Sequence, residues 1–262
     1  MTPDAALAAM QFHDGILIRP LRRGPLAHSW LVELAGERAV LRIDQPAAAA
    51  MGLDRAAEFA QLEAVAAAGL GPAPIVADPA RGLLLRRHVE GEPWQAADLG
   101  QAANLDRAAA LLRRVHSAQI TAPALDLHAA LERYARLAGP EASGLADTAR
   151  RQLDSCRDPQ SALVFCHNDP VADNFVAGSE SPGPLWLIDW EYSGFNEFWF
   201  DLAVVLVHHE LPASLAGRLL RAYFGRAPSA DEAQRLADWG AFYASLARLW
   251  VAALQRCSAN HP

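Results

Sequence analysis

Residues 164–202 read VFCHNDPVADNFVAGSESPGPLWLIDWEYSGFNEFWFDL, and two polar groups stand out in this stretch. The first is His167-Asn168-Asp169, with Asn174 five residues after the aspartate; the second is Asp189, at the end of an apolar run. The segment between them is rich in Gly, Ser and Pro, which predicts a turn. The apolar segments on either side of that turn predict the two short strands of a hairpin. The hairpin would bring Asn174 and Asp189 together at one end, although they lie fifteen residues apart in the sequence.

This pattern of oxygen-bearing side chains suits the transfer of a phosphoryl group. Such a site needs a carboxylate to accept the proton of the attacking hydroxyl, and a carboxamide and a second carboxylate to hold Mg²⁺ against nucleotide phosphates. Mg²⁺ prefers hard oxygen ligands and keeps much of its water, so one Asp and one Asn suffice beside the phosphates. We therefore expect Asp169 to be the catalytic base and Asn174 and Asp189 to be metal ligands. We expect His167 to position the loop.

The segments CHNDPVADNF (166–175) and LWLIDWEYSGFNEFWFDLA (185–203) resemble the choline/ethanolamine kinase branch of the aminoglycoside phosphotransferase-like kinases. In that branch a catalytic H-N-D-x-x-x-x-N is followed by I-D-W/F-E-Y. The resemblance is specific over about forty residues and looser over most of the chain. It implies an α+β, bilobal protein-kinase-like fold, with a small β-rich N-terminal lobe (1–89) and a larger, mainly helical C-terminal lobe (90–262). It also implies ATP- and Mg²⁺-dependent phosphorylation of a small alcohol.

The composition allows one large domain or two modest lobes. Of the 262 residues, 52% are hydrophobic, which is ample for a core and argues against disorder. The net charge of -7 argues against a general nucleic-acid-binding surface. All 23 basic residues are arginine. Because a kinase-like fold places a cation, often Lys, against the nucleotide phosphates, we expect arginine in that role.

The three cysteines are widely spaced and form no C-x-x-C, which is typical of reduced thiols in a cytosolic protein. The first residues lack the basic segment and apolar run of a secretory signal. No stretch approaches the ~18 uncharged apolar residues of a membrane span. We therefore expect a cytoplasmic protein without a membrane span, and the sequence does not indicate an oligomeric state.

Residues 16–18 and 30–34 predict two strands, and the loop between them lies where the resembled kinases cover the nucleotide. The family carries two glycines here, followed by a hydroxyl residue or Asn. This chain has Gly24 alone, followed by His28 and Ser29. Nucleotide contact through Gly24 and Ser29 is therefore an expectation that stands beside an ordinary hairpin turn.

The alternating segment 38–43 predicts a third strand, and Arg42 stands where the resembled family carries its phosphate-binding cation. Its planar guanidinium can bind phosphate oxygens in pairs; the alternative is a solvent-facing arginine on an edge strand. Residues 52–68 predict a helix. On that helix Glu58 matches the family's glutamate that pairs with the strand cation, with Glu63 as the competitor.

The remaining pattern predicts a loop at 71–76, a strand at 82–89, and helices at 4–12, 104–116, 126–138, 145–155 and 201–209. His116 ends its helix and is expected to be a cap or core residue. By resemblance Asp201 braces the catalytic loop; it could also cap its own helix. His208-His209 lacks the H-E-x-x-H pattern, so we expect no metal site there.

A stripe of large residues at helical spacing near the C-terminus predicts core packing: Trp239, Phe242, Tyr243, Leu246 and Trp250. The resemblance gives a sharper interpretation, in which Tyr243, Trp250 and Trp199 form an aromatic wall for a cationic head group. Aromatic faces hold a quaternary ammonium at ~0.5–2 kcal/mol each. Glu191, in I-D-W-E-Y, would attract the substrate cation or brace the loop.

The resemblance makes choline or ethanolamine the first expected substrate. Bacterial thiamine kinases share almost the same motif and also take a cation, and an aminoglycoside comes third. A catalytically silent nucleotide-binding protein is the rival from another class. The glycine-poor loop favours that rival, whereas the intact Asp169, Asn174 and Asp189 argue against it. The sequence does not separate ATP from GTP.

Overall fold

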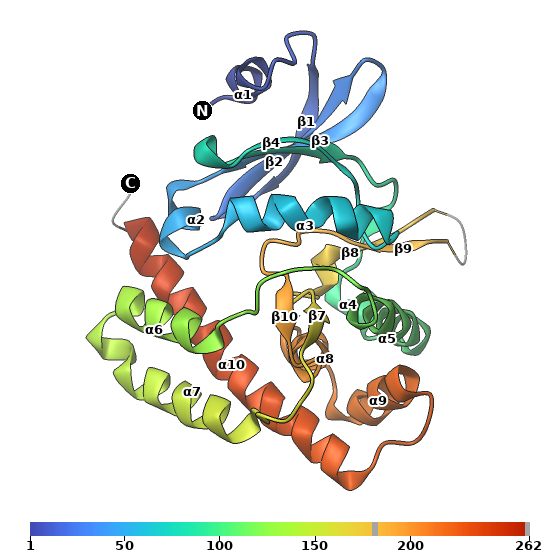
Figure 1. The fold of residues 1–262 in the computed structure, drawn as a ribbon, viewed down its shortest axis with the longest axis vertical. Helices are drawn as coiled ribbons and strands as arrows, with labels where there is room; N and C mark the ends of the chain where they lie inside the picture. Colours follow the sequence, from blue (N-terminus) through green and yellow to red (C-terminus); the bar gives the residue numbers. More distant parts are fainter. Residues whose placement is uncertain (180–182, 260–262) are drawn as a thin grey trace. The chain divides into compact units, whose positions relative to one another are not determined.

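The computed structural model describes residues 1–179 and 183–259. It divides the chain into two compact units (Figure 1). Unit 1 comprises Met1–Val89 with the residues from Cys257 onward, and unit 2 comprises Glu90–Arg256. Among the described residues, helices account for 51% and strands for 19%, which confirms the α+β class.

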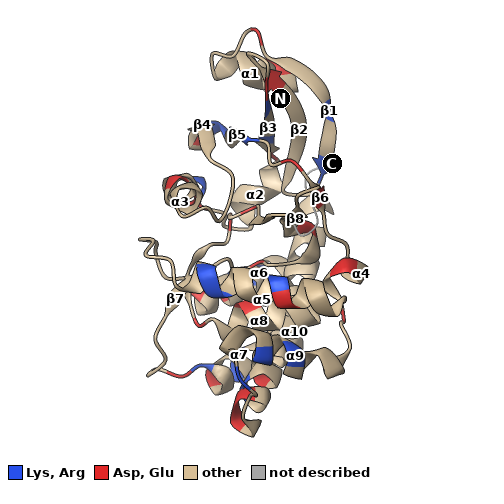
Figure 2. Ribbon diagram, turned by 90° about the vertical axis from the view of Figure 1, so that its right-hand side faces the viewer, with Lys and Arg blue, Asp and Glu red and all other residues tan. Residues whose placement is uncertain are grey.

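Unit 1 is built on a five-stranded antiparallel sheet in the order β1-β2-β3-β5-β4 (Figure 2). Its strands are β1 (Ile16–Arg23), β2 (Ala27–Leu34), β3 (Glu37–Asp44), β4 (Pro74–Asp78) and β5 (Leu83–Arg87). The sequence predicts a loop at 71–76. This prediction is wrong from Pro74 onward, because the Pro- and Ala-rich segment pairs with β5 at the edge of the sheet. Proline is tolerated at the first position of an edge strand, where its missing N–H costs nothing.

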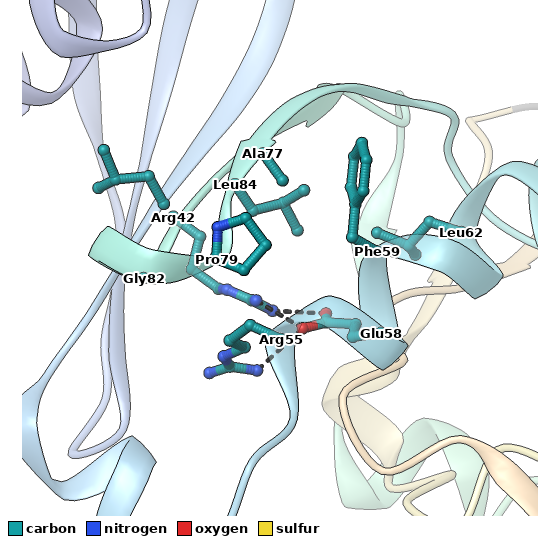
Figure 3. Close-up of a pocket in the computed structure, with 10 residues that line it drawn as sticks. Arg42, Arg55, Glu58, Phe59, Leu62, Ala77, Pro79, Gly82 and Leu84 are labelled. Carbon is teal, nitrogen blue, oxygen red and sulfur yellow. Dashed lines mark hydrogen bonds and ion pairs between the residues drawn. The ribbon is translucent and has the colours of Figure 1, made fainter. Parts of the chain in front are cut away.

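The two faces of this sheet bury different residues. The helix α1 (Pro3–Ala9) packs on one face, and the core there contains Ala6, Leu7, Met10, Trp30, Val32, Leu41, Ile43, Leu83 and Leu85. Because side chains alternate along a strand, Arg42 and Leu84 point to the opposite face. There they line a pocket with Phe59 and Leu62 of the helix α3 (Arg55–Ala67) (Figure 3).

The helix α3 begins three residues later than the sequence pattern predicts. Asp54 is its N-cap, and its carboxylate accepts hydrogen bonds from the backbone N–H groups of Ala56 (3.1 Å) and Ala57 (3.0 Å). An aspartate in this role satisfies N–H groups that have no partner inside the helix. The short helix α2 (Pro46–Ala50) precedes it.

Unit 2 is mainly helical. Its helices are α4 (Ala96–Leu99), α5 (Ala102–His116), α6 (Leu127–Ala138), α7 (Ser143–Cys156), α8 (Trp199–Val207), α9 (Ala216–Phe224) and α10 (Ala230–Ala259), whose last residues, from Cys257, are assigned to unit 1. Acidic and basic residues are interspersed along these helices, as α5 shows (Figure 2). Among the described helices, none combines the length and the apolar composition that crossing a membrane requires.

Short strands frame the polar loop of unit 2. The strand β7 (Val164–Cys166) pairs with β10 (Gly194–Asn196) and leads into the loop 167–171, which ends in the helical turn η3 (Ala172–Asn174). The strands β8 (Phe175–Ala177) and β9 (Leu185–Leu187) pair antiparallel, and β8 also pairs with β6 (Glu92–Pro93). The two strands of the hairpin expected from the sequence are therefore confirmed, and residues 180–182 of its expected turn lie outside the described residues.

Candidate active site

A buried carboxylate holds the start of the polar loop. Asp201 lies in the first turn of α8 and is fully buried. Its two oxygens accept hydrogen bonds from the backbone N–H groups of His167 (2.9 Å) and Asn168 (2.7 Å). The imidazole of His116 also bonds this carboxylate at 2.9 Å, and its other nitrogen contacts the Tyr223 hydroxyl at 2.7 Å. These bonds hold the loop backbone on α8 and connect it, through His116 and Tyr223, to α5 and α9.

The same contacts settle two expectations from the sequence. Asp201 is not the N-cap of its helix: Phe198 holds that position, and no side chain caps the helix there. The capping alternative is therefore wrong, because the carboxylate is directed to the backbone of the loop instead. His116 is a buried residue at the end of α5, as expected.

Asn168 lies at a bend of the loop, with a left-handed backbone (φ 64°) that asparagine tolerates better than most residues. Its amide nitrogen donates to the carbonyls of Tyr192 (2.9 Å) and Gly194 (3.3 Å). Its amide oxygen accepts a 2.9 Å bond from Asn196. Sequence reasoning did not find this role for Asn168 and Asn196, although an asparagine directly before an aspartate in a loop was an available signal.

His167 links the polar loop to the residue that directly follows the strand β9. Its Nδ1 accepts the backbone N–H of Asp169 at 3.3 Å, so its Nε2 carries the proton and donates to the carbonyl of Ile188 at 3.0 Å. Burial lowers the pKa of His167, which keeps the ring neutral and this tautomer in place. The ring of Trp190 packs edge-on against it at 4.6 Å. His167 therefore fixes the backbone on both sides of the site.

Asn174 contacts Asp169 directly. Its amide nitrogen donates to the backbone carbonyl of Asp169 at 2.9 Å and to the Oδ2 atom of the same residue at 3.1 Å. Both partners are acceptors, so the nitrogen and not the oxygen of the amide faces them. The Oδ1 atom of Asn174 is buried and, among the described residues, makes no hydrogen bond. A buried acceptor without a partner is costly, and it is the group that a metal ion would satisfy.

Asp189 lies next to Asn174 through the hairpin. The residues Phe175 and Leu187 are paired across the strands, and the N–H of Ile188 donates to the carbonyl of Asn174 at 3.0 Å. Asp189 follows immediately with a left-handed backbone (φ 65°), a strained conformation that is common at functional sites. One amide oxygen and one carboxylate form a set of hard donors that fits Mg²⁺.

In unit 1, two arginines and two carboxylates form one compact cluster, of which Figure 3 shows Arg42, Arg55 and Glu58. Arg42 donates to both oxygens of Glu58, at 2.7 and 2.6 Å. Arg55 donates to Glu58 at 3.0 Å and to both oxygens of Asp44, at 2.6 and 2.9 Å. Burial acts to raise the pKa of Glu58, but the two guanidinium groups outweigh it and hold that pKa below its usual value. The structure places Glu58 against Arg42, whereas Glu63 is exposed.

Ser29 and Arg42 lie side by side in unit 1. They are directly paired between β2 and β3, so their side chains project from the same face of the sheet. Gly24 lies in the tight turn between β1 and β2, where its N–H donates to the carbonyl of Ala27 at 2.9 Å. This turn is the hairpin that sequence analysis gave as the alternative for the loop.

Aromatic side chains gather near Asp169 in unit 2. Tyr134 and Tyr192 are hydrogen-bonded to each other, and Trp250 donates its indole N–H to the Tyr192 hydroxyl at 3.1 Å. Burial raises the pKa of Tyr134 to about 12 and that of Tyr192 well above its usual value, and the charges of Glu191 and Asp169 contribute to both shifts. The phenols therefore stay neutral beside two carboxylates. Sequence reasoning found Glu191 and Trp250 but missed the two tyrosines.

Tyr243 and Trp199 have different surroundings. Burial and the charge of Asp169 raise the pKa of Tyr243, whose hydroxyl contacts His208 at 2.6 Å. Trp199 instead packs against Phe198 (ring centroids 4.6 Å apart) and Phe224 (5.8 Å), with the guanidinium of Arg235 over its ring. The structure thus groups Glu191, Trp250 and Tyr243 with Asp169 and places Trp199 in another aromatic cluster. Trp239 and Phe242 are fully buried, as the helical stripe predicted.

The chain matches the phosphotransferase enzyme family over residues 17–239, most of its length, and it belongs to that family. The curated relative Protein LicA of Haemophilus influenzae is 34% identical over 85 residues, which cover 28% of this chain and 31% of LicA. The match therefore spans about a third of that relative's length.

Several solved structures are similar to this protein over nearly its whole chain. A choline/ethanolamine kinase family protein from Mesorhizobium loti is 25% identical, with a TM-score of 0.76 over 98% of this chain and 86% of that protein. The choline kinase LicA from Streptococcus pneumoniae is 16% identical, with a TM-score of 0.80 over 99% and 90%. A LicA structure in complex with AMP is 17% identical, with a TM-score of 0.78 over 96% and 88%. These findings confirm the resemblance and the protein-kinase-like α+β fold expected from the sequence.

Proposed function

We propose that this protein transfers the γ-phosphoryl group of ATP to the hydroxyl of a small cationic alcohol, with choline or ethanolamine as the first candidates. The observation that carries the proposal is the orientation of Asn174. Its amide nitrogen holds the Asp169 carboxylate, while its buried amide oxygen makes no hydrogen bond among the described residues. One residue thus aligns a base and offers a metal ligand.

In the proposed reaction Asp169 accepts the proton of the alcohol hydroxyl while the alcohol oxygen forms its bond to the γ-phosphorus. The bond from that phosphorus to the β,γ-bridging oxygen breaks, and its electron pair leaves with ADP. Asn174 keeps Oδ2 of Asp169 oriented, and His167 and Asp201 hold the backbone that carries both residues. Asn174 and Asp189 would hold Mg²⁺, which neutralises charge on the phosphates when bound.

For nucleotide binding we propose Arg42 as the phosphate-binding cation, with Ser29 beside it on the same face of the sheet. A guanidinium that turns toward phosphate gives up contact with its carboxylate partner. Here Arg55 also bonds Glu58 at 3.0 Å, so the buried carboxylate would keep a counter-ion when Arg42 contacts the nucleotide. The bound AMP in one LicA structure supports an adenine nucleotide as the donor.

For the alcohol we propose a site formed by Tyr134, Tyr192, Trp250 and Tyr243 with the carboxylate of Glu191. Neutral aromatic rings next to fixed negative charge attract an ammonium group, with ~0.5–2 kcal/mol from each well-placed ring. The charges of Asp169 and Glu191 act on Tyr134 and Tyr192, so the head group would lie close to the base. The names of the choline and choline/ethanolamine kinases among the similar structures support this class of substrate.

The test is ADP release from Mg-ATP with choline, ethanolamine, thiamine or one aminoglycoside, with Asp169→Asn beside it. We expect release with one of the first two alcohols and a loss of ~10²–10⁴-fold in kcat in the variant. Near-wild-type turnover by Asp169→Asn would overturn the mechanism. Release with thiamine or the aminoglycoside alone would keep the reaction and replace the substrate. No release from any alcohol, with Mg-ATP still raising the melting temperature, would favour a silent nucleotide-binding protein.

A further inference from the structure

Two adjacent histidines follow the end of α8, and the proposed reaction uses neither of them. His208 is the C-cap of the helix, and His209 is the next residue. The ring of His209 is half-buried, and its Nε2 atom accepts the backbone N–H of Ala172 at 3.0 Å. An acceptor in this position must be unprotonated, so the ring is neutral with its proton on Nδ1.

Ala172 is the first residue of the helical turn η3, whose last residue is Asn174. The first N–H groups of a helical turn have no partner within it. No side chain of the preceding residue caps this turn. His209 therefore supplies the cap from 37 positions further along the chain, between the base at 169 and the metal ligand at 174.

The helix α8 consequently holds the polar loop at two places. Asp201 in its first turn accepts the N–H groups of His167 and Asn168, and His209 just past its end accepts that of Ala172. Asp169 lies between these two anchors. We propose that His209 is a positioning residue, whose bond to Ala172 keeps the amide of Asn174 aimed at the Asp169 carboxylate.

The surroundings of His209 support a neutral acceptor. Burial lowers the pKa of His209, and the nearby carboxylate of Asp173 opposes that shift. The ring of His208 packs edge-on at 4.7 Å and is engaged with the Tyr243 hydroxyl.

The kinetic part of this inference rests on the proposed function, and the test compares three variants. His209→Leu removes the acceptor, whereas His209→Gln places its Oε1 atom where Nε2 lies. His128→Leu is the matched control, because His128 is exposed and lies 3.6 Å from the exposed Asp154 on the surface of unit 2. We expect His209→Leu to lower kcat ~10–100-fold with KM values for both substrates little changed, and His209→Gln to recover most of that loss.

The second readout is amide hydrogen exchange at Ala172, measured by NMR without any alcohol. We expect ~10-fold faster exchange in His209→Leu and wild-type exchange in His209→Gln and His128→Leu. Wild-type kcat in His209→Leu, a Gln variant as slow as the Leu variant, or unchanged exchange at Ala172 would each overturn the inference. If the wild type phosphorylates no alcohol, the proposed function fails and the exchange data still decide the role of His209. Should His209→Leu not fold, His209→Asn takes its place, because its shorter side chain does not reach Ala172.

Discussion

The carboxylate of Asp201 accepts more hydrogen bonds than the side chain of asparagine, which has the same shape, could accept in its place. Its carboxylate accepts two backbone N–H groups and the imidazole of His116 in a fully buried position. In Asp201→Asn the new NH₂ group would face one of these donors, which leaves buried groups without a partner. We expect the free energy of unfolding to fall by about 1–3 kcal/mol, measured by urea denaturation.

Asp154→Asn is the control for this change, because Asp154 is exposed and its ion pair is with the exposed His128. Surface substitutions of this kind stay within about 0.5 kcal/mol of wild type. Equal stability of the two variants would show that the carboxylate of Asp201 does not hold the loop in solution.

His167 makes the stability of the protein depend on pH in a defined direction. Its pKa in the folded protein is below the ordinary value of 6.5 because the ring is buried. The unfolded chain therefore binds this proton more readily than the folded protein, so the free energy of unfolding decreases as the pH falls below about 6.5. In His167→Asn we expect a smaller loss of melting temperature between about pH 7.5 and about pH 5.5. Parallel pH profiles of the variant and the wild type would contradict the prediction.

The turn between β4 and β5 requires a glycine at one position. Gly82 has a left-handed backbone (φ 65°), and a Cβ added there would lie 2.7 Å from the Cβ atom of Asp44. Because Asp44 holds Arg55 through two hydrogen bonds, Gly82→Ala would strain the turn and push on the arginine cluster. We expect a loss of about 1–3 kcal/mol in the free energy of unfolding.

Gly217 gives the matched comparison, because it lies inside α9 and a Cβ added there meets no atom within 4 Å beyond its chain neighbours and the backbone of its own helix. Alanine loses less conformational freedom than glycine in a helix, so Gly217→Ala should leave the stability unchanged or raise it by about 0.5–1 kcal/mol. Urea denaturation of both variants is the measurement. The same loss of stability in both variants would mean that the contact with Asp44 does not cause the loss in Gly82→Ala.

The strands and helices that could be predicted are those whose own residues carry the pattern of that element. The hairpin of β8 and β9 follows from apolar runs around a Gly/Pro-rich turn, and the helices follow from their periodic apolar positions. The strand β4 was missed because pairing with β5, not its own composition, makes it a strand. For the site, the spacing of Asp169 and Asn174 was visible in the sequence. The bonds from Asp201 and His209 span 33 to 37 positions, and a one-dimensional pattern does not contain them.

At the scale of the molecule, the two units carry separate parts of the proposed reaction. Unit 1 holds the arginines, and Arg55 shares the carboxylate of Glu58 with Arg42. Unit 2 holds the base and the residues that would bind the metal. Because Glu58 keeps Arg55 as a partner, Arg42→Gln is expected to stay folded, which makes nucleotide binding testable apart from catalysis.

We therefore expect Arg42→Gln and Asp169→Asn to fail in different ways. A ligand at 100 times its Kd stabilises the folded state by about 2.7 kcal/mol, which appears as a higher melting temperature. Arg42→Gln should lose most of this rise with Mg-ATP, because the cation proposed for the phosphates is gone. Asp169→Asn should keep the rise while ADP release falls, because its carboxylate acts on the alcohol proton. A full rise in Arg42→Gln would remove Arg42 from the nucleotide site, and the loss of the rise in Asp169→Asn would give that residue a part in nucleotide binding.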